Sequence, residues 1–255
     1  MKIHLLLVGL SILSGCSQHP YDSDQLVNYV KSPASSDKLC IDEIDRAKVD
    51  IENGKIVLTQ PAGFLFGFIR YEDELAQLSN QYGLEFDFDL LSCIEIDGQT
   101  QGCYGATMEN EIIERFGPNF SEQLHERADS IFLSNVLAND RSVDSWNCDE
   151  EAMLLADFKQ TLYISELSIK KGTATYGRGW PFMDLEFVIE LDSSIGNFKY
   201  SNFVSQDSAN SSYEHQLFLL GSNHLIQEYP TWVPGRIKSQ PVRTNKSVRI
   251  FFAKE

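Results

Sequence analysis

Several short patterns contain residue types that act in hydrolysis or bind metals. Ser168-Ile169-Lys170-Lys171 matches the Ser-x-x-Lys pattern, in which a lysine accompanies a serine nucleophile. The companion Lys-Thr-Gly is missing, because the local order is Lys171-Gly172-Thr173. His215 and His224, with Glu228, are residue types that ligate metals. Neither set forms a complete motif, and together they are the candidates for a hydrolase site.

A zincin-like string occurs at residues 125–129, where Asp129 takes the place of the second histidine. An i,i+4 pair of His125 and Asp129 on a helix surface accounts for this spacing without a metal. No phosphate-binding loop, dinucleotide-binding glycine pattern or Gly-x-Ser-x-Gly motif occurs in the chain. We therefore expect no metal and no cofactor, and the sequence leaves any catalytic residue unknown.

Carboxylates alternate with apolar side chains along residues 85–97. This period of two is typical of a strand with one solvent-exposed face. The acidic face consists of Glu85, Asp87, Asp89, Glu95 and Asp97. No loop with the oxygen-ligand spacing of a calcium site accompanies them. This acidic stripe is a candidate surface for contact with a cationic protein, and a solvated strand face is the alternative.

Two loops rich in aromatic, proline and glycine residues are further interaction candidates. They are residues 176–181, which include Trp180, and residues 229–236, which include Trp232. Exposed tryptophan on a rigid loop favours contact with peptides or glycans. The alternative is that both indoles fill the core beneath the loops.

The first sixteen residues have the layout of an export signal. Lys2 gives a short positive start, and residues 5–13 are apolar but too few to span a bilayer. The Leu13-Ser14-Gly15-Cys16 ending resembles the lipobox of bacterial lipoproteins. The resemblance implies cleavage before Cys16 and acylation, for example by palmitate, of its thiol and new amino group. Ser17, directly after this cysteine, resembles the pattern of lipoproteins that are sorted to the outer membrane by default.

Four further cysteines are expected to form two disulfides in an exported chain, and four cysteines allow three pairings. A hairpin centred on Gly98 would place Cys93 opposite Cys103. That pairing leaves Cys40 to bond with Cys148. No Cys-x-x-Cys spacing supports a zinc site.

Charge is unevenly spread along the chain. Of its 255 residues, 37 are acidic and 21 are Lys or Arg, and the formal net charge of −16 excludes a general affinity for nucleic acid. Residues 17–148 contain 24 acidic and 9 basic side chains, whereas residues 149–255 contain 13 and 11. The last twenty residues are basic, and we expect them to form a strand that lies against the acidic half.

The residue patterns predict an α+β fold with antiparallel hairpins and helices, two disulfides in the N-terminal half and a β-rich C-terminal half. In the N-terminal half they predict helices over residues 71–82, 107–116 and 119–137, a hairpin over 48–59 around Asn53-Gly54, and a buried strand over 62–69. In the C-terminal half they predict a short helix over 152–158 and strands over 161–169, 184–191, 198–204 and 247–252.

The expected organisation has four segments. They are a lipoprotein signal peptide over residues 1–15, a lipidated flexible tether over 16–38, an acidic disulfide-bonded α+β domain over 39–148 and a β-rich domain over 149–255. We expect a protein that is lipid-anchored to the outer membrane, faces the periplasm and acts by binding rather than catalysis. Its expected partner is a cationic protein, such as a toxin to be neutralised, or an envelope component. The alternative is an envelope hydrolase acting on peptidoglycan or peptides.

Overall fold

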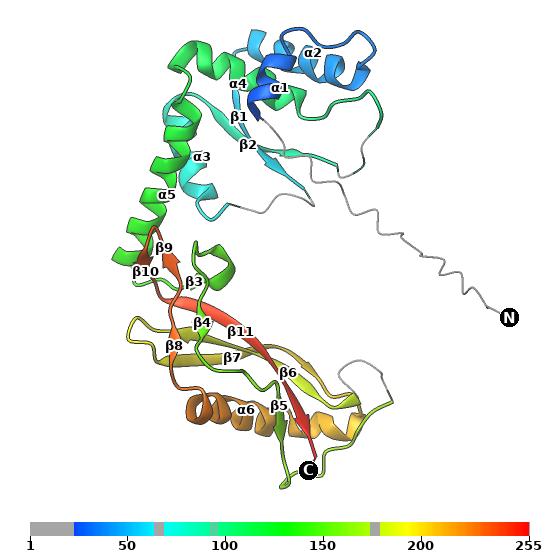
Figure 1. Ribbon diagram of the computed structural model, residues 1–255, viewed down its shortest axis with the longest axis vertical. Helices are drawn as coiled ribbons and strands as arrows, with labels where there is room; N and C mark the ends of the chain where they lie inside the picture. Colours follow the sequence, from blue (N-terminus) through cyan, green and yellow to red (C-terminus); the bar gives the residue numbers. More distant parts are fainter. Residues whose placement is uncertain (1–22, 64–68, 93, 95, 174–178, 255) are drawn as a thin grey trace, which may run out of the picture. The chain divides into compact units, whose positions relative to one another are not determined.

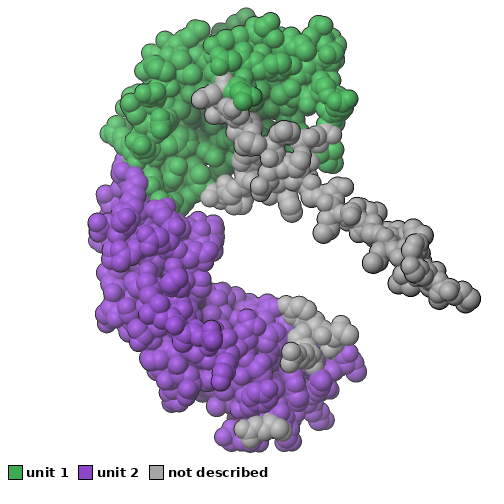
Figure 2. Space-filling model, viewed as in Figure 1, with its two compact units in different colours: residues 1–129 green, residues 130–255 purple. Residues whose placement is uncertain are grey.

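The computed structural model describes residues 23–63, 69–92, 94, 96–173 and 179–254. The chain divides into two compact units, residues 1–129 (unit 1) and residues 130–255 (unit 2), coloured separately in Figure 2. The division falls inside one helix and precedes the position expected from sequence, after residue 148. Helices and strands occur in both units, so the predicted α+β class is confirmed. Within the described residues, no helix is both long enough and apolar enough to cross a membrane.

Unit 1 is built on two parallel strands and the helices around them. Its elements are α1 (Ser23–Tyr29), α2 (Lys38–Glu52), β1 (Val57–Ala62), α3 (Glu72–Gln81), β2 (Glu85–Leu90), α4 (Cys103–Phe116) and the first part of α5 (Phe120–Ala138), as Figure 1 shows. Val57 of β1 lies opposite Glu85 of β2, and Ala62 lies opposite Leu90. Parallel neighbours need a crossover connection instead of a tight turn, and α3 lies in that connection. The helices α3 and α5 have nearly the predicted bounds.

Part of the predicted tether is folded. Leu26 in the middle of α1 and Val30 directly after it are buried in one cluster with Cys40. Asp37 is also buried, and its Oδ1 accepts hydrogen bonds from the backbone N–H of Cys40 at 3.2 Å and of Thr100 at 3.1 Å. Asp37 thereby caps α2, as short polar side chains do at helix N-termini. The folded part of the chain therefore includes α1 and the start of α2, and residues 16–22 of the predicted tether lie outside the described residues.

The predicted hairpin over residues 48–59 is wrong, because α2 continues to Glu52. The buried residues of α2 are Cys40, Ile44 and Ala47, which are four and three residues apart, as the helical period requires. Asn53 is the C-cap, and Gly54 has a φ of +80°. An Asn-Gly pair ends a helix as readily as it turns a hairpin, because both uses require left-handed backbone.

The predicted hairpin around Gly98 is also wrong. A turn does exist there, since an isolated antiparallel bridge joins Ile96 to Gln99. However, β2 ends at Leu90, and Cys103 begins a helix instead of a returning strand. Gly102, with a φ of +84°, is the N-cap that directs the chain into α4.

The disulfide of unit 1 joins Cys40 of α2 to Cys103 of α4, with 5.2 Å between the two Cα atoms. Both cysteines are fully buried. The predicted pairings are therefore wrong, because Cys103 bonds to Cys40 and not to Cys93, and Cys40 is not bonded to Cys148. Cys93 lies outside the described residues, and the Cys148 thiol lies 3.8 Å from the Asp144 carbonyl oxygen.

Unit 2 contains a twisted sheet with one long helix packed on it. Its elements after α5 are β3 (Val143–Asp144), η1 (Ser145–Asn147), β4 (Met153–Leu154), β5 (Thr161–Tyr163), β6 (Phe182–Ile189), β7 (Ile195–Val204), η3 (Ser208–Tyr213), α6 (Glu214–Glu228), β8 (Trp232–Val233), β9 (Arg236–Ile237), β10 (Gln240–Pro241) and β11 (Thr244–Ala253). The strand order is β3-β11-β6-β7, and β5 also pairs with β11. The β6–β7 and β6–β11 pairs are antiparallel, whereas β3 and β5 run parallel to β11.

The core of unit 2 lies between the sheet and α6 (Figure 1). Leu185, Phe187 and Ile189 of β6 point into it, as their alternation predicts, and Leu217 of α6 meets them from the other side. A Cβ at Gly221 would lie 2.9 Å from the Leu185 side chain, so glycine allows α6 to approach the sheet closely.

Three predictions in this half need correction. The expected helix over residues 152–158 is absent, and Met153–Leu154 forms the short strand β4 instead. The strand predicted over residues 161–169 is confined to Thr161–Tyr163. Leu191 lies beyond the end of β6 and is 53% exposed, since the turn begins there.

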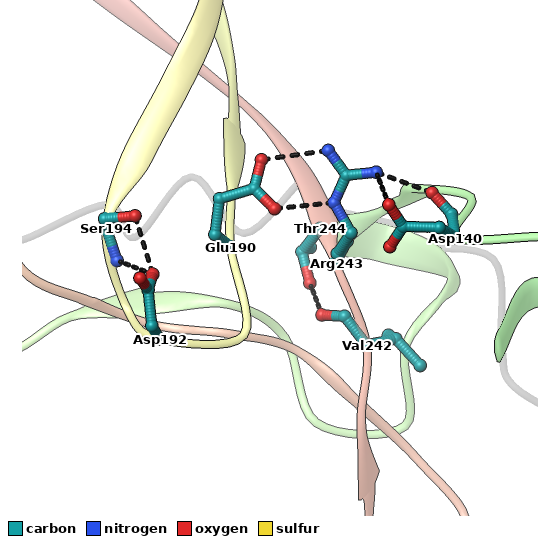
Figure 3. A network of polar contacts seen from close by, with 7 residues as sticks. All are labelled: Asp140, Glu190, Asp192, Ser194, Val242, Arg243 and Thr244. Carbon is teal, nitrogen blue, oxygen red and sulfur yellow. Dashed lines mark hydrogen bonds and ion pairs between the residues drawn. The ribbon is translucent and has the colours of Figure 1, made fainter.

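The basic tail forms the strand β11, which pairs with β3 at the end of the acidic half defined by sequence, and it binds acids on both sides of residue 148. Arg243 donates from Nε and Nη2 to the Glu190 carboxylate at 2.6 and 2.9 Å, and its Nη1 lies 3.2 Å from Asp140 (Figure 3). Arg249 binds Asp184 through two hydrogen bonds of 2.6 and 2.8 Å. These planar two-point pairs fix β11 on its neighbours, because guanidinium and carboxylate match in geometry.

Candidate functional site

The residues of the predicted acidic stripe do not all lie on one strand face. Glu85, Asp87 and Asp89 alternate along β2, and Glu85 forms an exposed ion pair with Lys55 at 3.4 Å. Asp97 is exposed in the turn before Gly98, and Glu95 lies outside the described residues. Asp87 and Asp89 are brought into a cavity of about 450 Å³.

We call this space the acidic cavity. Its lining comes from α2, β1, β2 and the start of α4, and comprises Glu43, Arg46, Asp50, Lys55, Thr59, Asp87, Phe88, Asp89, Leu90 and Tyr104. Four of these side chains are carboxylates and two are cations. The cavity is therefore net acidic even before the exposed acids around it are counted.

Two of the carboxylates lie at the N-terminus of α4. Its N-cap is Gly102, which has no side chain to accept the first free N–H groups of the helix. Glu43 takes over this role, because its Oε2 accepts a hydrogen bond from the backbone N–H of Tyr104 at 3.2 Å. A Cβ at Gly105 would lie 2.5 Å from Thr59 Oγ1 and 3.0 Å from Asp89 Oδ2. Glycine thus lets the strands bring Asp89 up to the helix end, where the dipole favours negative charge.

Burial makes these two acids unusual. It raises the pKa of Asp89, and the nearby Arg46 guanidinium and the backbone N–H of Gly105 offset only part of that rise. Burial also raises the pKa of Glu43, and the negative charge of Asp89 adds to this rise. Asp89 Oδ2 is buried and has no hydrogen-bond partner among the described residues. Partly buried carboxylates are costly when their charge is not compensated, so the cavity favours a ligand that brings positive charge.

The cations of the cavity are already engaged. The Arg46 guanidinium lies over the Tyr104 ring, 4.5 Å from its centroid. The Tyr104 hydroxyl donates to Asp50 Oδ2 at 2.8 Å, and its pKa is raised by burial and by this hydrogen bond. Arg46 is therefore held beside the acids by a cation–π contact, and neither it nor Lys55 provides the donor that Asp89 Oδ2 lacks.

A second cavity of unit 1, of about 480 Å³, contains Glu109, Ser121 and His125. Ser121 Oγ donates to Glu109 Oε2 at 2.7 Å, and burial raises the pKa of Glu109. Burial lowers the pKa of His125, whose Nδ1 lies 3.3 Å from the Tyr71 hydroxyl. Asp129 does not pair with His125 on the helix surface, because it is buried in a salt bridge with Arg70.

The hydrolase candidates do not form a common centre. Ser168 is exposed, and the Lys171 ammonium lies 5.9 Å from the centroid of the Trp180 ring. His215 and His224 are nine residues apart on α6, which separates them by about 13 Å along the axis. Burial lowers the pKa of His224, whose ring packs edge-on against Tyr229. No group of three or more potential metal ligands gathers anywhere in the described part of the chain.

Of the two alternatives for Trp180 and Trp232, burial in the core is the one that the structure shows for Trp232. Trp232 is 3% exposed, its Nε1 donates to the Tyr229 carbonyl oxygen at 2.9 Å, and its ring packs on Phe187. Trp180 is half-buried against the same core, and residues 174–178 of its loop lie outside the described residues. The exposed indole is Trp146, at 63%. Sequence reasoning missed it, although an isolated tryptophan between Ser145 and Asn147 is itself a signal of exposure.

Comparison with known proteins identifies no relative. No protein-family model matches the chain, and no curated protein or solved structure is similar enough to be matched to it. The function has to be inferred from the sites themselves.

Proposed function

We propose that this protein is a lipid-anchored binding protein of the periplasmic face of the outer membrane. It receives basic side chains of a protein partner in the acidic cavity of unit 1. The observation that carries the proposal is the acidic cavity itself, in which four carboxylates, two of them with a pKa raised by burial, face only two cations. A lysine or arginine of the partner would supply the compensating charge and donate hydrogen bonds to the accessible carboxylate oxygens of the cavity.

The charge of unit 1 supports the same partner class. Residues 23–129 contain 21 acidic and 8 basic side chains, whereas residues 130–255 contain 15 and 12. A concentration of one sign of charge on one unit accelerates encounter with an oppositely charged protein, and the effect weakens with salt. No second function is proposed, because Ser168, Lys171, His215 and His224 have no shared geometry that favours hydrolysis.

Binding of a lysine tetrapeptide by the purified mature protein tests the cavity. We expect Asp89→Asn and Asp87→Asn each to weaken binding by about tenfold or more in calorimetry, which is about 1.4 kcal/mol. Affinity should fall as NaCl is raised from about 50 to 300 mM. It should also fall as the pH is lowered, and at a higher pH than ordinary carboxylates would give, because burial raises the pKa of Glu43 and Asp89.

Asp97→Asn is the matched control, since it removes the same charge from an exposed position outside the cavity. We expect it to change the affinity less than about twofold at about 0.15 M salt, where exposed charges are screened. Equal losses from Asp97→Asn and Asp89→Asn would refute the cavity and leave only general electrostatic attraction.

The anchor makes a separate prediction. Cys16→Ser removes the thiol that the lipobox-like ending assigns to acylation. We expect labelled palmitate to be incorporated into the native protein and not into the variant, and the variant to leave the membrane fraction, because stable anchoring needs acyl chains. Cys148→Ser, which changes a cysteine far along the chain, should retain the label. An unlabelled native protein would disprove the lipoprotein assignment.

A further inference from the structure

Unit 2 has a cavity that the proposed function does not use. It measures about 520 Å³, within the range of small-molecule sites, and Trp146 lies in its wall. We call it the Trp146 cavity. The other lining side chains come from β3, β6, β7 and β11 and from the segment before β4, and most of them are polar.

The exposed position of Trp146 is built into the fold. Trp146 is the middle residue of η1, and the preceding Ser145 is buried. Ser145 Oγ accepts a hydrogen bond from the backbone N–H of Ala152 at 3.1 Å and another from Lys246 Nζ at 3.2 Å. Lys246 also binds Glu151 at 3.2 Å. These contacts fix the residue that precedes the tryptophan, which holds a 63% exposed indole at the cavity.

The charged groups around the indole are paired with one another. Lys199 of β7 binds Glu186 of β6 at 2.9 Å, which lowers the pKa of Glu186. Asn245 Nδ2 donates to Asp144 Oδ1 at 2.9 Å. With the Lys246–Glu151 pair, the cavity presents three carboxylates and two ammonium groups, nearly balanced in charge.

From this combination we propose that the Trp146 cavity binds a neutral oligosaccharide. The apolar C–H face of a sugar ring packs on a flat indole, which a tryptophan offers with little loss of side-chain freedom. A sugar hydroxyl donates and accepts at once, so it can bridge a carboxylate to an ammonium or amide group without disturbing their pairing. The proposal is independent of the proposed function, because all of these residues lie in unit 2 and the acidic cavity lies in unit 1.

Charged ligands fit this cavity less well. A phosphate would have to break an existing ion pair to reach Lys199 or Lys246, and a lysine side chain would have to break one or displace the Asn245 amide from Asp144, so either exchange gives little net free energy. A purely apolar ligand would leave the ammonium, carboxylate and amide groups without their solvent partners. Only a ligand with many hydroxyl groups and one apolar face matches both parts of the lining.

Titration of the full mature protein with tetra-N-acetylchitotetraose and maltotetraose tests the inference. We expect at least one of them to bind with a Kd on the order of 0.1–1 mM and to change tryptophan fluorescence. Trp146→Ala should weaken binding by about tenfold or more, whereas Trp146→Phe, which keeps an aromatic face, should cost about threefold or less.

Leu155→Ala is the matched control, because Leu155 is 76% exposed in the same unit and does not line the cavity. It should leave the affinity unchanged, and since both side chains are exposed, all variants should unfold like the native protein. Absence of saccharide binding up to about 10 mM, or equal affinity of Trp146→Ala and the native protein, would overturn the proposal. Trp146-dependent binding of tetralysine without saccharide binding would overturn it too, by showing a peptide site instead.

Discussion

Replacing Cys40 and Cys103 together by alanine is expected to lower the free energy of unfolding of unit 1 by about 4 kcal/mol. The disulfide closes a loop with a sequence separation of 63, and the chain-entropy relation gives a cost of that size for losing such a crosslink. Both sulfur atoms are buried between α2 and α4, so the packing of the two helices is weakened as well. Urea unfolding followed by hydrogen exchange of the α2 and α4 amides would measure the loss.

The chain supplies its own internal reference for this experiment. All three tryptophans, at positions 146, 180 and 232, lie in unit 2. Tryptophan fluorescence should therefore report an almost unchanged transition of unit 2 while the amides of unit 1 lose protection. Cys93→Ser is the decisive control, because it leaves the Cys40–Cys103 bond intact. If Cys93→Ser destabilised unit 1 as much as Cys103→Ala, the pairing predicted from the hairpin would be correct.

The predictions that succeeded depend on long local patterns. The strand β6 follows the strict alternation of Leu185, Phe187 and Ile189, and both faces of the pattern match the buried and polar sides of the sheet. The α5 helix has nearly its predicted bounds and buries Leu124, Ala128 and Phe132 at the helical spacing. In such segments every turn or residue pair repeats the same hydrophobic period, so the local sequence is sufficient to predict the element.

The failures arise where one local signal serves two structures. Asn53-Gly54 ends α2, and Gly102 begins α4, although both looked like parts of hairpins. The choice is made by tertiary contacts, since the buried Cys40 and Cys103 must face each other. The hairpin centred on Gly98 was predicted from neighbouring residues only, and it could not include the contact with Cys40, which is distant in sequence.

The candidate site shows the same division. Asp87 and Asp89 were predicted from the alternation of β2, because strand period alone places them on one face. Glu43 and Asp50 were missed, since they come from α2 and join the site only through packing against α4 and β2. For Trp232 the sequence left exposure and burial open, because aromatic residues near proline and glycine cover cores as often as they face solvent, and the structure shows that it is buried.

Asp129→Asn is expected to cost about 3–5 kcal/mol of unit 1 stability, because it leaves the buried Arg70 charge without its counterion. Arg70 Nε and Nη2 donate to the two Asp129 oxygens at 2.7 and 3.0 Å. The two side chains are only 13% and 10% exposed, so water can replace little of the lost interaction. Loss of amide protection in α3 and α5 under urea would measure the effect.

Glu122→Gln provides the control, since it removes one charge from an exposed position on the same helix and should change stability by less than about 0.5 kcal/mol. The double variant Arg70→Met/Asp129→Leu separates the charge from the packing. Replacing both partners of a buried ion pair by apolar side chains removes the desolvation penalty along with the attraction, so the double variant should be more stable than Asp129→Asn. A double variant less stable than Asp129→Asn would instead show that the Arg70–Asp129 pair contributes net stability through its own hydrogen bonds.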